Sequence, residues 1–260
     1  MFRVDAFTAR RFAGNPAAVM LLEDFPADAL LQDIAAENNL SETAFLVPAA
    51  GDYRLRWFTP TTEVGLCGHA TLASAAVVME RLQPDRRRVV FETQSGPLTV
   101  DQAGAAYVMD FPARQSAPTT APDGLDQALG VTSIDVFVNA VNYLALLESA
   151  AVLRALEPDM ELIARVSDAG RHGVIVTAPG DDGYDFVSRY FAPAIGVPED
   201  PVTGAAHCML APYWAKRLGK NTLRAFQASR RGGEIVCRVS GERVQLQGSC
   251  VFYLEGAAWI

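Results

Sequence analysis

The N-terminal part of the chain shows the hydrophobic patterns of strands around one helix. Apolar and polar residues alternate from Phe2 to Phe7, which predicts a half-buried strand, and a second strand is predicted from Ala17 to Leu22. Between Asp24 and Asn39 the apolar residues recur at the spacing of one helical face, and a further strand follows from Ala44 to Val47. Glu42 therefore lies at a predicted junction between a helix and a strand.

The rest of the N-terminal half predicts more strand than helix. A single helix is expected from Thr71 to Arg81. The remaining predicted strands are Tyr53 to Phe58, Arg88 to Thr93, Leu98 to Asp101 and Ala106 to Phe111, with Arg243 to Leu246 and Val251 to Leu254 closing the chain. This mixture of elements indicates an α+β fold.

One pattern occurs twice at long range. Trp57-Phe58-Thr59-Pro60 is followed, after a loop, by Gly68 and a helix of small residues, and Tyr190-Phe191-Ala192-Pro193 is followed, after a longer loop, by Gly204 and another such helix. Coincidence is one explanation, because proline, loop, glycine and helix are common neighbours, but the shared order favours an internal duplication. The segment Gln115 to Gly124, rich in Ala, Pro and Thr, is then a linker that divides the chain into halves 1–114 and 115–246.

Composition and charge limit the classes of function. The chain has 260 residues, of which 50% are apolar and 20% are charged, and its mean hydropathy is +0.12, so it can bury a core and is not disordered. The net charge is −8, and basic residues cluster only at Arg86 to Arg88 and at Arg230-Arg231. A nucleic-acid partner is therefore not expected.

The sequence shows no sign of a membrane or secretory route. Its apolar runs are too short to cross a bilayer, and no charged segment leads into an apolar stretch after Met1. Widely spaced cysteines without a CxxC pair are typical of free thiols in a reducing cytoplasm. They are Cys67, Cys208, Cys237 and Cys250. We expect a cytoplasmic protein without a membrane partner.

Several common functional motifs are missing. The sequence has no GxGxxG, P-loop, GxSxG or HExxH motif, and His69, His172 and His207 lack the spacing of metal ligands. We therefore predict no cofactor and no metal, and we interpret His172 and His207 as structural.

Two loops that open helices are the strongest candidates for ligand binding. Gly68-His69-Ala70 and Thr203-Gly204-Ala205 would each present unpaired backbone N–H groups at the positive end of a helix dipole. Such a site suits an anion, here a small carboxylate. A simpler alternative is that these glycines only begin their helices.

Three titratable residues lie near these loops. A glutamate such as Glu42 is usually a solvated charge, and an aspartate before proline, such as Asp200, is usually a turn residue or helix cap. A carboxylate beside a desolvated anion site can instead act as a base and then as an acid. His69 could donate a hydrogen bond to an oxyanion or move a proton.

A few polar residues can be interpreted either as ligand-binding residues or as ordinary structural ones. Asn15, between Gly14 and Pro16, and Gln227, near Gly232-Gly233, can reach the ligand or be ordinary turn and hairpin residues. Arg56 alternates with Arg54 on a predicted strand and can equally face solvent.

Four motifs, in order, resemble those of the phenazine-biosynthesis PhzF-like isomerase family. The resemblance extends from Met1 to the C-terminal strands. It is carried by Asp5-Ala6-Phe7-Thr8 with Phe12 to Val19, Asn39 to Phe45, Phe58-Thr59-Pro60 with Glu63 to Thr71, and Ser188 to Pro193 with Glu199 to His207.

The resemblance implies the fold of diaminopimelate epimerases. Two pseudo-symmetric halves would each wrap a curved, mostly antiparallel sheet around a central helix, with the active site between them. The central helices would be Thr71 to Arg81 and Ala205 to Arg217, and residues 247–260 would return to the N-terminal half. The family also leads us to expect a homodimer.

The resemblance further implies a reaction without a cofactor, in which a carboxylate moves a proton within a small unsaturated or amino carboxylate. Glu42 matches the acid/base residue, and His69 and Asp200 match its supporting residues. The residues expected at the substrate are Asn15, Gly68, Ala70, Thr203, Gly204, Ala205 and Gln227.

One position departs from the family pattern. Ala205 stands where the motif usually has serine, so a hydroxyl expected at the substrate is missing and the phenazine precursor is a doubtful substrate. Backbone N–H donors at the helix start would survive this change.

Two other functions stay open. A racemase or epimerase of this fold uses two cysteines, and Cys67 matches one of them, whereas Pro201-Val202-Thr203-Gly204 has no thiol for the other face. A binding protein could keep the cleft without turnover, although it would not need Glu42, His69 and Asp200 together.

Overall fold

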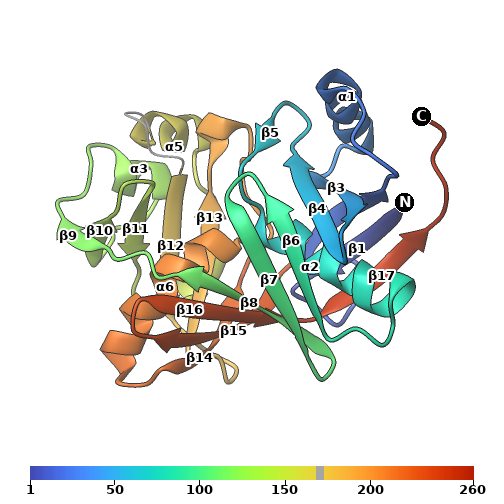
Figure 1. The fold of residues 1–260 in the computed structure, drawn as a ribbon. Coiled ribbons are helices and arrows are strands. Elements are labelled where there is room, and N and C mark those ends of the chain that lie inside the picture. Colours follow the sequence, from blue (N-terminus) through green and yellow to red (C-terminus); the bar gives the residue numbers. More distant parts are fainter. Residues whose placement is uncertain (168–172) are drawn as a thin grey trace. The chain divides into compact units, whose positions relative to one another are not determined.

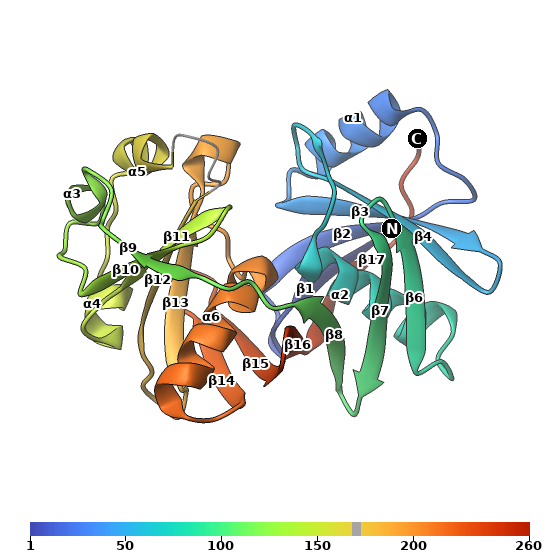
Figure 2. The same ribbon diagram turned by 60° about the vertical axis from the view of Figure 1, so that its left-hand side comes forward.

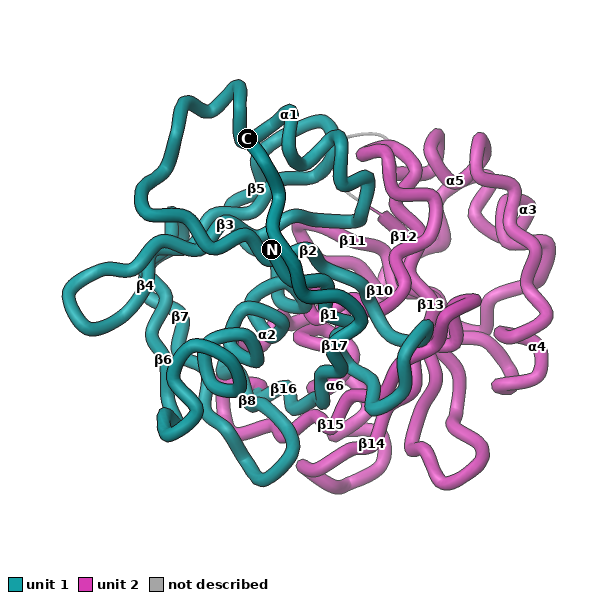
Figure 3. Tube along the Cα trace, turned by 90° about the vertical axis from the view of Figure 1, so that its right-hand side faces the viewer, with its two compact units in different colours: residues 1–110, 245–260 teal, residues 111–244 magenta. Residues whose placement is uncertain are grey.

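The chain divides into two compact units. The computed structural model describes residues 1–167 and 173–260. Unit 1 consists of Met1–Asp110 and Gln245–Ile260, and unit 2 of Phe111–Val244 (Figure 3). The chain therefore passes out of unit 1 once and returns to it at its C-terminal end.

Unit 1 is built on a strand sheet with two crossovers. Strand β1 pairs antiparallel with β2, β2 runs parallel to β3, β3 pairs antiparallel with β4, β4 runs parallel to β6, and β6 and β7 continue antiparallel (Figure 1). The last strand, β17, returns to pair antiparallel with β1. The strands are β1 (Phe2–Ala6), β2 (Asn15–Leu21), β3 (Glu42–Ala49), β4 (Asp52–Phe58), β5 (Glu63–Val64), β6 (Arg88–Thr93), β7 (Gly96–Ala103), β8 (Ala106–Pro112) and β17 (Cys250–Glu255).

Helices occupy the two parallel connections of unit 1. Helix α1 (Asp28–Asn38) joins β2 to β3, and α2 (Gly68–Val77), followed by a π-helical turn (Val78–Leu82), lies between β4 and β6. Every residue of α2 from His69 to Val77 is buried. A helix that is apolar on all sides is a core helix, and its alanines allow strands to approach closely. The prediction of a central helix is confirmed here.

Unit 2 repeats the strand pairings of unit 1. Strand β9 pairs antiparallel with β10 and β10 with β11, β11 runs parallel to β12, β12 pairs antiparallel with β13, β13 runs parallel to β14, and β14 pairs antiparallel with β15. The strands are β9 (Ala117–Thr119), β10 (Asp135–Val138), β11 (Asn142–Leu146), β12 (Gly173–Pro179), β13 (Phe186–Phe191), β14 (Thr222–Gln227), β15 (Gly233–Ser240) and β16 (Arg243–Gly248), which crosses into unit 1.

The central helix of unit 2 is α6 (Gly204–Leu218), between β13 and β14 (Figure 2). The smaller helices are α3 (Leu125–Leu129), α4 (Ala150–Arg154) and α5 (Met160–Val166), and a single 3-10 turn spans Pro193–Ile195. The strands of both units thus pair in the same order of antiparallel and parallel neighbours. In each unit the central helix lies in the second parallel connection. The α+β fold with two pseudo-symmetric halves, predicted from the sequence, is confirmed.

Some local predictions need correction. The proposed linker, Gln115 to Gly124, contains β9, which is exposed along its length and therefore carries no hydrophobic alternation. Asn15 and Pro16 belong to β2 rather than to a turn. The helix expected from Asp24 begins at Asp28, because Phe25-Pro26 disfavours a helical residue before proline.

The expectations about membrane-spanning segments and about the cysteines can be compared with the structure. No helix among residues 1–167 and 173–260 combines the length and the apolar character needed to span a membrane. All four cysteines are free thiols, as predicted.

Candidate active site

Glu42 is placed by the end of a crossover. Helix α1 stops at Asn39, which takes a left-handed conformation (φ 46°) typical of a helix C-terminus, and the chain turns into β3. Glu42 is the first residue of β3 and stands opposite Ala17 of the parallel strand β2. Its side chain is 18% exposed. The carboxylate is therefore largely desolvated but still reachable.

His69 brings this carboxylate together with the start of helix α2. His69 is the second residue of α2, and its Nε2 lies 3.3 Å from Oε2 of Glu42. On the other side of the ring, Nδ1 lies 3.2 Å from Nδ2 of Asn15 and 3.5 Å from Sγ of Cys67. Nδ1 thus faces the Asn15 amide and the Cys67 thiol, and Nε2 faces Glu42.

The histidine is neutral. Burial lowers the pKa of His69 from 6.5 to about 3, because the charged imidazolium would lose its hydration. At neutral pH the ring therefore cannot act as a cationic acid. Its Nε2 lies beside the Glu42 carboxylate as part of an uncharged ring.

The same residues are a possible metal ligand set. Ligand atoms of Glu42, Cys67 and His69 lie within 4.8 Å of one another. The thiol faces Nδ1 of the imidazole and the carboxylate faces Nε2. One ion needs its ligands at roughly 2.0–2.3 Å around a single point, so this arrangement does not match a tetrahedral site.

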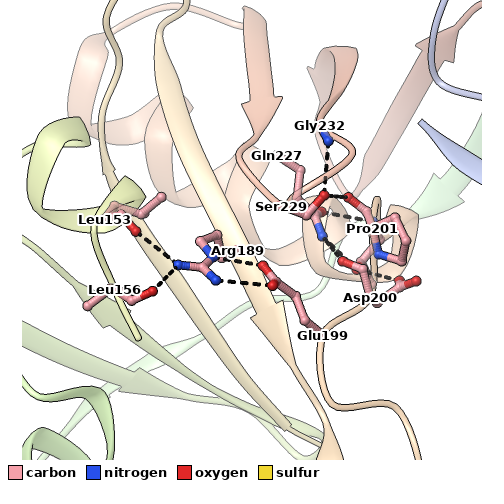
Figure 4. A network of polar contacts seen from close by, with 10 residues as sticks. Leu153, Leu156, Arg189, Glu199, Asp200, Pro201, Gln227, Ser229 and Gly232 are labelled. Atoms are coloured by element: carbon pink, nitrogen blue, oxygen red, sulfur yellow. Dashed lines mark hydrogen bonds and ion pairs between the residues drawn. The ribbon is translucent and has the colours of Figure 1, made fainter. Parts of the chain in front are cut away.

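In unit 2, Asp200 is held in a closely bonded loop. Thr203 Oγ1 donates to Oδ2 of Asp200 at 2.6 Å. The amide of Gln227 donates to the carbonyl of Asp200 at 2.8 Å and accepts from the Thr203 backbone N–H at 2.8 Å (Figure 4). Asp200 is half-buried, its carboxylate is held by Thr203 and its backbone carbonyl by Gln227.

Both central helices start in the same way. Cys67 caps α2 and Thr203 caps α6, each with extended backbone and neither with a side-chain hydrogen bond into the first turn. The first N–H groups of each helix, those of residues 68–70 and 204–206, have no intrahelical acceptor. Ala205 is exposed at this point. Each helix start can therefore offer backbone donors to an anionic group.

The structure groups the predicted residues within the units. It brings Glu42, His69 and Asn15 together in unit 1, and Asp200, Thr203 and Gln227 together in unit 2. Asn15 and Gln227 are both fully buried, and their amides contact His69 and the Asp200 loop. These two side chains thus position other residues.

The remaining histidines differ. His207 is fully buried on α6, where Nδ1 donates to the Thr203 carbonyl at 2.8 Å, and burial lowers the pKa of His207 to about 4. This contact fits the structural role predicted for it. His172 lies outside the described residues.

Comparisons with known proteins identify the family. The model of the phenazine biosynthesis-like (PhzC-PhzF) family matches residues 4–256. The chain belongs to the PhzC-PhzF family. It is 50% identical over 254 residues to an uncharacterized isomerase of Pseudomonas aeruginosa, covering 98% of this chain and 96% of that one.

Solved structures agree. A PhzF-family phenazine biosynthesis protein from Enterococcus faecalis superposes with a TM-score of 0.95 at 41% identity, covering 100% of this chain and 98% of that one. A probable proline racemase from Agrobacterium radiobacter shares the fold, with a TM-score of 0.60 at 13% identity, over 98% of this chain and 92% of that one. The fold is thus common to PhzF proteins and racemases.

Proposed function

We propose that this PhzF-family chain is an isomerase that moves a proton within a small carboxylate by acid/base catalysis, using its own side chains. The observation that carries the proposal is the 3.3 Å contact between Oε2 of Glu42 and Nε2 of the buried, neutral His69. The relatives named as isomerases support the reaction class.

In the proposed reaction, Glu42 removes a proton from a carbon next to a double bond. The C–H electron pair forms a new double bond, the old double bond shifts its electrons to its far carbon, and the protonated Glu42 returns the proton there. The product is an isomer, so no atoms or electrons are gained. His69 contacts Glu42 through Nε2 and stays neutral during the transfer.

The other predicted residues have supporting roles in this proposal. Asp200, fixed by Thr203, is the second carboxyl group that can exchange a proton with the substrate. The helix-start N–H groups of Gly68, Ala70, Gly204 and Ala205 bind carboxylate oxygens. Because Ala205 offers a methyl group, the substrate needs no partner hydroxyl at that position.

The racemase alternative is less well supported. Two-base racemisation needs a thiol on each face of the substrate carbon, and Cys67 caps α2 in contact with His69. The corresponding cap of α6 is Thr203, and Cys208, further along that helix, is buried. A threonine hydroxyl is far too weak an acid to replace a thiol.

The test is deuterium incorporation followed by NMR in deuterated water, with small unsaturated and amino carboxylates as probes. Exchange by the wild type that is lost in Glu42→Gln and kept in Cys67→Ser supports the proposal. Exchange lost in Cys67→Ser but kept in Glu42→Gln establishes the racemase. Binding without exchange in the wild type and in both variants establishes a binding protein.

The family expectation of a homodimer is a separate proposal. Light scattering on the intact protein tests it: a mass near twice 28.0 kDa supports the dimer, and a mass of 28.0 kDa refutes it.

A further inference from the structure

Each unit holds a matching, mostly buried ion pair before its central helix. In unit 1, Nε and Nη2 of Arg56 lie 2.7 and 2.8 Å from the two carboxylate oxygens of Glu63. In unit 2, Nε and Nη2 of Arg189 lie 2.7 and 3.0 Å from those of Glu199 (Figure 4). Both pairs are bidentate, which fixes orientation as well as distance.

The two pairs occupy equivalent positions in the two sheets. Arg56 stands opposite Phe45 in the β3–β4 ladder, and Arg189 stands opposite Val176 in the β12–β13 ladder. Each arginine is followed by an aromatic residue, phenylalanine, any residue and proline. Each glutamate precedes its helix-starting glycine by the same interval, 63 to 68 and 199 to 204. The correspondence therefore includes both chain order and register.

The guanidinium groups make equivalent further contacts. Each lies over the ring of the phenylalanine two residues later in the chain, at 5.1 Å for Arg56 and 4.9 Å for Arg189. Each also binds the preceding crossover: Arg56 reaches the carboxylate of Asp28 at 2.9 Å, and Arg189 reaches the carbonyl of Leu156 at 2.7 Å. In both units one arginine links the crossover segment to the loop before the central helix.

A serine holds the other side of each loop. Ser95 Oγ donates to the carbonyl of Gly65 at 2.6 Å, and Ser229 Oγ donates to the carbonyl of Pro201 at 2.8 Å. Both accepting residues come two positions after the paired glutamate. Both serines come two positions after the strand that runs parallel to the arginine's strand, β6 or β14.

Burial distinguishes these pairs from the surface pairs of the same units. The side chains of Arg56 and Glu63 are 17% and 24% exposed, and those of Arg189 and Glu199 are 11% and 21% exposed. By contrast, the values are 42% and 78% for Arg54 with Asp24. Partly desolvated pairs are costly to break, whereas exposed pairs contribute little.

We infer that Arg56, Glu63 and Ser95 in unit 1, and Arg189, Glu199 and Ser229 in unit 2, are duplicated positioning residues that set the two loops leading into the central helices. We call each set a loop frame. The frame of unit 1 holds the loop that ends at Cys67 and His69, and the frame of unit 2 holds the loop that carries Asp200. The effect that this inference predicts on catalysis rests on the proposed function, whereas the effect that it predicts on amide exchange does not.

The test is hydrogen–deuterium exchange by mass spectrometry on the full chain, with Arg189→Gln and Arg56→Gln. Loss of a bidentate pair should speed exchange of amides 200–207 in Arg189→Gln on the order of tenfold, with amides 64–71 unchanged. Arg56→Gln should show the reverse. Arg154→Gln and Arg54→Gln, which break exposed pairs in the same units, should change neither segment.

The outcomes separate a positioning role from a merely stabilising one. Unchanged exchange in both segments, or an equal rise across every peptide, overturns the inference. If Arg189→Gln does not fold, Arg189→Lys and Ser229→Ala replace it, because each removes only part of the frame, and a smaller rise confined to amides 200–207 is then expected.

A kinetic readout links the frames to the proposed reaction. With a probe that the wild type exchanges, Arg189→Gln should lower kcat by roughly tenfold or more, while Arg154→Gln keeps the wild-type rate. Unchanged kcat with altered exchange of amides 200–207 would overturn the catalytic importance of the frame. If the wild type exchanges no probe, the proposed function fails, and the amide-exchange result still decides the positioning role.

Discussion

The two helix starts share their framework and differ in their chemistry. Helices α2 and α6 follow the same strand order, and in each a residue of the first turn anchors the cap carbonyl: Thr71 Oγ1 donates to Cys67 O at 2.6 Å, and His207 Nδ1 donates to Thr203 O at 2.8 Å. The titratable residues near these helix starts have no such match. Phe45 and Val176 stand opposite the two matching arginines, and counting back from them pairs Glu42 with Gly173. Counting forward from the matching glutamates, Glu63 and Glu199, pairs Val64 with Asp200, Cys67 with Thr203 and His69 with Ala205.

The duplicated fold keeps one framework in both units and varies the side chains that it carries. The framework that presents backbone donors is kept in both units, because any anionic ligand needs it. A carboxylate beside a neutral histidine occurs in unit 1, and a carboxylate that accepts from a threonine, on a loop bound by a glutamine, occurs in unit 2. Proton transfer is therefore expected to depend on unlike groups, in contrast to a symmetric two-thiol racemase.

The largest effect is expected for Glu42→Gln. The substitution keeps size and hydrogen-bonding capacity but removes the proton carrier, so deuterium incorporation should fall by roughly 10²–10⁴-fold. NMR exchange rates measure this, with exposed Glu37→Gln on α1 as the matched control. A rate within threefold of the wild type would show that Glu42 is not the proton carrier, and the proposed chemical difference between the two units would then be wrong.

Asp200→Asn should have the next largest effect. The amide can still accept from Thr203 Oγ1 but cannot exchange a proton, and a loss of roughly 10²-fold in kcat is expected if unit 2 contributes a second proton-transfer group. Asp182→Asn, on a surface turn of the same unit, is the control. A change confined to KM would instead make Asp200 a binding residue.

The two helix anchors should contribute differently to the stability of the protein at acid pH, because His207 titrates and Thr71 does not. The pKa of His207 is about 4 in the folded protein and 6.5 as its ordinary value. Below pH 6.5 the unfolded chain binds a proton that the folded chain does not, so stability is present above pH 6.5 and is lost as pH falls toward 4.

Urea unfolding between pH 7 and pH 4.5 measures this loss. His207→Gln, which keeps a donor for the Thr203 carbonyl, should reduce the pH dependence by up to about 1.4 kcal/mol per pH unit. The dependence that remains comes in part from His69, whose pKa is lowered to about 3. Equal slopes in both proteins would show that His207 takes up its proton in the folded state.

Ala205→Ser should have the smallest effect. The position is exposed, so the free energy of unfolding should change by less than about 0.5 kcal/mol. The added hydroxyl tests whether this position selects the substrate: a changed ranking of probe carboxylates is expected, with stability as the internal control. An unchanged ranking would mean that the methyl group of Ala205 does not contact the probes.

Much of the fold could be predicted from the sequence. Alternation and helical periodicity located strands such as Arg88–Thr93 with the same bounds that the structure gives. The repeated aromatic-Phe-x-Pro pattern indicated the duplication, because it ends the same strand in each unit. The short exposed strand β9 has no buried face and so leaves no periodic signal.

The site was predicted less completely. Motifs indicated Glu42, His69 and Asp200 as candidates, but the contact of Glu42 with His69 and that of Gln227 with Asp200 are long-range. Arg56, which alternation left free to face solvent, is mostly buried against Glu63, whereas Arg54 two residues earlier is exposed. Arg54 and Arg56 share one face of β4, so alternation cannot tell which of them a neighbouring segment covers, although the matching Arg–Phe spacing in the second half was a usable signal.

The return of β17 to unit 1 affects the order in which the protein can fold during synthesis. Strand β1, made first, pairs on one side with β17, and the backbone of Met1 exchanges hydrogen bonds with Gly256. Unit 2 is one continuous segment, 111–244. Unit 2 can therefore complete its sheet without the last strand of the chain, whereas β1 of unit 1 keeps an open edge until residues 250–255 are available to pair with it.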